Sequence, residues 1–167
     1  MKSKYILGTL ILLVLLAGVV WIARPGKNRT ANQARLNQTA EKDNLTAAET
    51  FYDFGSISMA AGKVSRVFPV KNTGSNLITI EKMYTSCMCT TAILRGKREW
   101  GPYGMPGHGF TGKMKEELNP GEEARVEVIF DPAAHGPAGV GRIERSVYLE
   151  DNTGANLELQ FTATVTP

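Results

Sequence analysis

Residues 157–166 have the sequence Leu-Glu-Leu-Gln-Phe-Thr-Ala-Thr-Val-Thr, and this stretch decides the fold class. Apolar and polar side chains alternate strictly, which is typical of a β-strand with one face in a core and the other in water. The same alternation continues through residues 126–130 and 143–150. Earlier strand-like runs, separated by turn-forming Gly, Asn and Pro, are residues 51–57, 63–71, 77–87 and 90–94. About seven short strands without a helical pattern predict an all-β, immunoglobulin-like β-sandwich.

The N-terminal part of the chain has a different pattern. The stretch Tyr5–Ala23 contains no charged residue, and as a helix it would extend about 28 Å, close to the roughly 30 Å hydrocarbon core of a bilayer. A cleavable signal peptide has a shorter apolar core, so we expect a single uncleaved transmembrane helix, with a cleaved signal as the alternative. The predicted organisation is a signal anchor (1–23), a flexible polar tether (24–49) and a folded domain (50–167).

Charge excludes one class of function and leaves the membrane orientation open. The domain carries 12 Lys and Arg against 13 Asp and Glu, so it offers no basic face and nucleic-acid binding is not expected. Basic residues flank the apolar stretch on both sides, so the positive-inside rule does not fix its orientation. A single N-terminal anchor before a β domain is the usual plan for export. We therefore expect a single-pass membrane protein with its C-terminal domain outside the cytoplasm.

Four motifs occur in a fixed order along the domain. They are Tyr-Asp-Phe-Gly from residue 52, Phe-Pro-Val-Lys-Asn-Thr-Gly from residue 68, Ser-Cys-Met-Cys-Thr from residue 86 and Asn-Pro-Gly-Glu from residue 119. This order resembles the bacterial domain-of-unknown-function 1573 family, which is exported and similar to the sandwiches of the major sperm protein and hydin class. The resemblance implies a sandwich fold and implies no activity. Two features depart from the family pattern, Met88 in place of a glycine and the long insertion 95–118.

The motif from residue 86 contains both cysteines of the chain. If Cys87 and Cys89 lie on a regular strand, both thiols point to the same face, with Cα atoms roughly 6.6 Å apart. A disulfide at that separation would be strained, whereas two thiols on one face can bind a soft metal ion. The alternative is that both cysteines are small core residues, because free cysteine is among the most buried residue types.

The insertion 95–118 is rich in glycine and contains two prolines, which predicts an irregular loop. Three aromatic side chains on it would bind a partner or fold back to cap the sandwich: Trp100, Tyr103 and Phe110. The loop also carries three further candidate ligands, Met105, His108 and Met114. With Cys87 and Cys89 these residues would form a site for Cu(I) or Zn(II). His135 and the pair Glu116 and Glu117 are expected to be solvent-exposed.

Three functions are compatible with these sequence features. The first is a membrane-anchored binding or structural module that docks an unidentified protein of the bacterial envelope. The second is a soft-metal domain built on Cys87, Cys89 and the insertion. The third, a thiol redox protein, ranks last because no Lys or Arg adjoins Cys87 in the sequence to lower the pKa of its thiol. No residue pattern indicates a catalytic site, so an enzyme is not expected.

Overall fold

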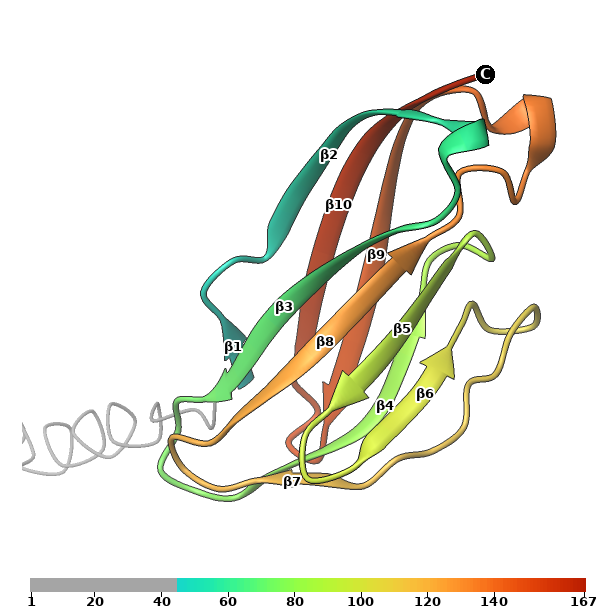
Figure 1. The fold of residues 1–167 in the computed structure, drawn as a ribbon. Coiled ribbons are helices and arrows are strands. Elements are labelled where there is room, and N and C mark those ends of the chain that lie inside the picture. Colours follow the sequence, from blue (N-terminus) through green and yellow to red (C-terminus); the bar gives the residue numbers. More distant parts are fainter. Residues whose placement is uncertain (1–44) are drawn as a thin grey trace, which may run out of the picture. The chain divides into compact units, whose positions relative to one another are not determined.

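The computed structural model describes residues 45–167, and these residues form two five-stranded sheets. In Figure 1, strands β3, β8, β5 and β6 lie in front of β2, β10, β9 and β4. The predicted transmembrane segment Tyr5–Ala23 and most of the predicted tether lie outside the described residues. Within residues 45–167, no helix is long and apolar enough to cross a membrane.

The first sheet has the strand order β1-β3-β8-β5-β6. Its strands are β1 (Leu45–Ala47), β3 (Val64–Asn72), β8 (Glu123–Phe130), β5 (Thr90–Arg95) and β6 (Glu99–Tyr103). The second sheet has the order β2-β10-β9-β4-β7. Its strands are β2 (Phe51–Ser58), β10 (Asn156–Thr166), β9 (Gly141–Asp151), β4 (Ile78–Thr85) and β7 (Glu116–Leu118). Two short 3-10 helices complete the described part, η1 (Met59–Ala61) and η2 (Gly136–Gly139).

The core lies between the sheets and follows the alternation seen in the sequence. Val126 and Val128 of β8 are buried, as are Leu159 and Phe161 of β10, while Glu158 is exposed. Phe161 also packs edge-on against Phe54 of the first motif, with 5.4 Å between ring centroids. Apolar burial of this kind is the main favourable contribution to folding. The predicted all-β sandwich is confirmed.

The predicted count of about seven strands is too low, because residues 45–167 contain ten. The seven predicted runs correspond to β2, β3, β4, β5, β8, β9 and β10. The missed strands β1, β6 and β7 have three to five residues each, which is too short for an alternating pattern to stand out. β6 and β7 both lie in the insertion, so the prediction that this segment is wholly irregular is wrong.

The sheet also starts earlier than the boundary at residue 50 that the sequence suggests. β1 pairs with β3, with Leu45 opposite Asn72, and Leu45 is only 9% exposed. The sequence assigns these residues to the tether because the polar composition of that segment hides three strand residues. Leu45–Ala47 therefore belong to the folded domain.

The second and fourth motifs meet at one end of the sandwich. The Asn72 side chain, which is fully buried, donates hydrogen bonds to the carbonyls of Asn76 and Leu118. The Asn72 backbone N–H donates to the Glu122 carbonyl, and the Glu122 carboxylate accepts from the Asn119 N–H. These bonds satisfy buried polar groups, so the two motifs are explained by the fold.

We predict that a fragment starting at Leu45 is more stable than one starting at Thr50. Removing β1 leaves the edge of β3 unpaired and takes the buried Leu45 side chain out of the core, which should lower the free energy of unfolding by about 2 kcal/mol. Urea denaturation of the two fragments, followed by far-ultraviolet circular dichroism, measures the difference. Equal stability of the fragments would show that β1 is not part of the folding unit.

Candidate functional site: a cluster of two cysteines, a histidine and an arginine

Both cysteines lie in the turn that joins β4 to β5. β4 ends at Thr85 in one sheet and β5 begins at Thr90 in the other, so residues 86–89 carry the chain across the sandwich. The Thr90 N–H donates to the Cys87 carbonyl at 3.1 Å, which closes a β-turn with Met88 at its exposed tip. The prediction that the cysteines sit on a regular strand is wrong, because the strand ends before them.

The residues around the cysteines hold this turn in place. The buried Thr85 hydroxyl lies 2.9 Å from the Cys87 carbonyl and 3.1 Å from the Thr90 carbonyl. Ser86 is tied to Ser146 of β9 by two bonds, from its N–H to the Ser146 carbonyl and from the Ser146 N–H to its hydroxyl, both 2.9 Å. The backbone is therefore fixed on both sides of Cys87.

The turn brings the two sulfur atoms together, 2.6 Å apart. The Cys89 thiol donates to Cys87, and the Cys89 backbone N–H also points at the Cys87 sulfur, at 3.4 Å. Cys89 is 3% exposed, whereas Cys87 is half-buried at the surface. The pair thus has one sulfur in the core and one that solvent can reach.

His135 joins the pair from the connection between β8 and β9. Its Nε2 lies 3.2 Å from the Cys87 sulfur. Thr90 at the start of β5 pairs with Phe130 at the end of β8, and the Asp131 N–H donates to the Cys89 carbonyl. The turn after β8 consequently begins beside the cysteines. His135 is exposed and lies in a turn, as expected, but it also contacts the Cys87 sulfur.

Arg145 of β9 reaches the cluster from the inside of the sandwich. Its Nε donates to the Cys89 sulfur at 3.4 Å, and its Nη1 donates to the Glu144 carbonyl at 2.7 Å. A guanidinium at a sulfur stabilises the thiolate form. The fold therefore places a positive charge beside the two cysteines, although no Lys or Arg is adjacent to Cys87 in the sequence.

This environment lowers the pKa of the Cys87 thiol to about 7. Burial on its own would raise that pKa, but the hydrogen bonds from the Cys89 thiol and N–H, the His135 contact and the charge of Arg145 outweigh it. Burial, together with the hydrogen bond donated to Cys87, raises the pKa of Cys89. Near neutral pH Cys87 therefore loses its proton more readily than Cys89.

Two of the candidate ligands in the insertion, His108 and Met114, lie outside the cysteine cluster. Among the Cys, His, Asp and Glu side chains of residues 45–167, one group of at least three places its ligand atoms within 4.8 Å of one another, and it consists of Cys87, Cys89 and His135. His108 is not a member. It occupies an exposed turn closed by its own N–H and the Met105 carbonyl, although the neighbouring Gly104 carbonyl accepts a bond from the Thr85 N–H.

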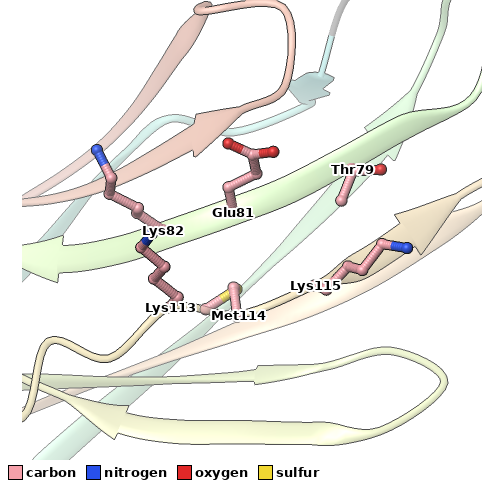
Figure 2. A pocket seen from close by; sticks show the side chains of 6 residues that line it. All are labelled: Thr79, Glu81, Lys82, Lys113, Met114 and Lys115. Carbon is pink, nitrogen blue, oxygen red and sulfur yellow. The ribbon is translucent and has the colours of Figure 1, made fainter.

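Met114 is held away from the cysteines. Its N–H donates to the Glu81 carbonyl in the middle of β4, about 13 Å of strand before Thr85. Figure 2 shows its side chain in a pocket beside Thr79, Glu81 and three lysines, Lys82, Lys113 and Lys115. Pairing with β4 thus places Met114 in a pocket separate from the cysteines.

The three aromatic residues of the insertion differ in their accessibility. Tyr103 is 1% exposed and stacks on Phe110, so it is a core residue and is not available to a partner. Trp100 is half-buried, and its indole N–H donates to Glu116. Phe110 is 64% exposed. Packing explains Tyr103 and Trp100, and Phe110 alone presents an open aromatic surface among these three.

Glu116 is a further correction, since it is 1% exposed rather than solvated. Its two carboxylate oxygens accept from the Lys97 N–H at 2.5 Å and the Trp100 indole N–H at 2.8 Å. The carboxylate thereby ties the β5–β6 hairpin of one sheet to β7 of the other. Through this carboxylate, the insertion links the two sheets along one side of the sandwich.

The sequence contained a signal for one of the two residues that were missed. Arg145 has the same parity in β9 as the buried Val147 and Leu149, so it occupies an inward-facing position where a charge requires a partner. His135 could be placed only by the pairing of β5 with β8, a contact between strands distant in sequence.

The fold and the cluster together define a β-sandwich module with a dithiol, an imidazole and a guanidinium at one end. The family model of DUF1573, a protein family of unknown function, matches residues 45–99, and the predicted resemblance to this family is confirmed. The match includes the two cysteines and ends before His135 and Arg145. No curated protein matches the chain.

Three solved structures are similar to this chain at low sequence identity. A protein of unknown function from Porphyromonas gingivalis W83 is 15% identical with a TM-score of 0.53, over 72% of this chain and 46% of that one. The secreted serine protease VesC from Vibrio cholerae is 11% identical with a TM-score of 0.49, over 78% and 25% of the chains. The PapD-like domain 7 of human CEP192 is 11% identical with a TM-score of 0.45, over 75% and 87%. This chain thus spans less than half of the first two proteins.

We predict that Cys87 reacts with iodoacetamide before Cys89 in the reduced protein. Its rate should rise with pH through a midpoint near 7, because the thiolate is the reactive form. Tandem mass spectrometry distinguishes the two positions, and Arg145→Met should move the midpoint upward by removing the stabilising charge. Faster labelling of Cys89, or a midpoint near that of an ordinary thiol, would contradict the described environment.

We also predict that Glu116→Ala lowers the free energy of unfolding by about 2 kcal/mol, because two donors lose their acceptor in a buried position. The matched control is Glu117→Ala, whose surface ion pair with Lys115 contributes less than about 1 kcal/mol. Urea denaturation measures both variants. Equal effects of the two substitutions would contradict a stabilising role for the Glu116 hydrogen bonds between the sheets.

Proposed function

We propose that the domain is a binding module for a soft metal ion, held by Cys87, Cys89 and His135. The observation that supports this most strongly is the convergence of two sulfurs and an imidazole nitrogen within 4.8 Å of one another from two separate connections of the sandwich. Thiolate and imidazole are the ligands that Cu(I) and Zn(II) prefer. The lowered pKa of Cys87 favours metal binding, because a coordinating thiol must lose its proton.

The ligands need a small adjustment to accept an ion. Metal–sulfur bonds of about 2.3 Å in a tetrahedral site separate two sulfurs by roughly 3.8 Å. The sulfurs lie 2.6 Å apart here, so they must separate by about 1 Å. Cys87 is half-buried and His135 is exposed, which leaves both side chains room to rotate while Cys89 stays in the core.

Metal binding is compatible with the wider role that the sequence suggests. In this proposal the apolar segment Tyr5–Ala23 anchors the chain in a membrane and displays the sandwich outside the cytoplasm, where an envelope protein would be its partner. Phe110, 64% exposed, and Met88, 49% exposed, are apolar side chains that such a partner could cover. The domain would act by binding rather than by catalysis.

Thiol–disulfide exchange is a second candidate, favoured by the short sulfur separation and the Arg145 contact. The Cys87 thiolate would attack the disulfide of a partner protein and release one partner thiolate. Cys89 would then lose its proton, attack the mixed disulfide and release the second. The domain ends with a Cys87–Cys89 disulfide and the partner with two thiols, so atoms and electrons balance.

The test is an anaerobic titration of the reduced full-length chain with Cu(I) against a chromogenic chelator. We expect one ion per chain, and we expect His135→Ala to weaken binding by roughly tenfold or more through loss of one ligand. His108→Ala is the matched control, because this exposed histidine lies outside the cluster, and it should leave the affinity unchanged.

Two outcomes would overturn the metal proposal. One is the absence of stoichiometric binding in the reduced protein. The other is equal affinity in the wild type and in the Cys87→Ser, Cys89→Ser double variant. If a Cys87–Cys89 disulfide instead equilibrates with a protein dithiol and no metal binds, the exchange reaction is the better account.

A further inference from the structure

Arg145 is a charged residue at an inward-facing position. In the ladder between β9 and β10 it stands opposite Phe161, and its neighbours of the same parity, Val147 and Leu149, are fully buried. A guanidinium stays protonated across the usable pH range, so its charge must be compensated where it lies. Partial burial makes that compensation important, because an unpaired charge away from water is costly.

Beside Arg145, the described groups that can become anionic are the two thiols. The ion pairs found among residues 45–167 do not include Arg145, whose contacts go to the Cys89 sulfur and the Glu144 carbonyl. The carboxylate of Asp131, which follows β8, lies 3.9 Å from the Lys63 ammonium, and these two charges offset each other. The net charge at the cluster is therefore set by the two thiols and Arg145.

The charge balance differs between a monovalent and a divalent ion. With both thiols deprotonated and His135 neutral, the ligands carry two negative charges and Arg145 adds one positive charge. A monovalent ion brings the total to zero, whereas a divalent ion leaves a net charge of +1 beside the core. Resting on the metal site proposed above, we infer that Arg145 makes the cluster favour monovalent Cu(I) over divalent Zn(II).

A ratio of affinities isolates this effect from the general role of Arg145 at the thiols. Stabilisation of the thiolates by Arg145 helps both metals equally and cancels in the ratio. Repulsion between the guanidinium and the bound ion scales with the charge of the ion, so it is twice as large for Zn(II). Thiolates prefer Cu(I) in any case, and for that reason the change in the ratio is the quantity to measure.

The experiment compares anaerobic Cu(I) and Zn(II) competition titrations of the full-length chain with those of Arg145→Met and Arg145→Lys. We expect Arg145→Met to lower the Cu(I):Zn(II) affinity ratio by roughly tenfold or more, and Arg145→Lys to recover most of it because the charge is restored. Arg142→Met is the matched control, since Arg142 is an exposed residue of the same strand. Arg145→Gln is a second neutral variant if Arg145→Met does not fold, as judged by thermal unfolding.

The results separate this inference from the proposed function. An unchanged ratio in the neutral variants, with Cu(I) still bound, would overturn the role of Arg145 and leave the metal site intact. A wild type that binds neither ion would overturn the metal site itself. A lower ratio that lysine does not recover would show that the shape of the arginine, rather than its charge, sets the preference, and would also overturn the inference.

Discussion

The crossing of the chain from one sheet to the other between Thr85 and Thr90 is the constraint on which the cluster depends. Packed sheets lie about 10 Å apart, and residues 86–89 must cover that distance while satisfying their own polar groups. A β-turn closed on Cys87 and the bonds of Thr85 to both flanking carbonyls achieve this. The turn places both sulfurs at the end of the sandwich, and β5 then begins where β8 ends, which brings the connection carrying His135 alongside.

The cluster has an inner side and an outer side, and they have different roles. Cys89 and Arg145 face the interior, where a fixed guanidinium at 3.4 Å from the sulfur has a strong electrostatic effect. Cys87 and His135 face the solvent, where a metal ion or a partner thiol could arrive. The charge of Arg145 therefore stays beside the sulfurs, while Cys87 and His135 remain accessible from solvent.

The sequence predicted the sandwich well because alternation over β8 and β10 directly reflects burial, as Val126, Val128, Leu159 and Phe161 show. It predicted that the two cysteines lie close together because residues two positions apart are near each other in both a strand and a turn. It missed His135, because only the pairing of β5 with β8 brings that residue to the cysteines. It also missed Arg145, although the alternation along β9 marks that charge as inward-facing. It also favoured His108 and Met114 because they are closer in sequence, whereas pairing with β4 holds Met114 in a separate pocket (Figure 2).

X-ray absorption at the copper edge of the Cu(I)-loaded full-length chain tests most directly whether these side chains form one site. The account predicts a first coordination shell of two sulfur atoms and one nitrogen atom, with the nitrogen lost in His135→Ala and retained in His108→Ala. A shell that contains sulfur alone, or a nitrogen that persists in His135→Ala, would contradict the assignment of His135 to the cluster.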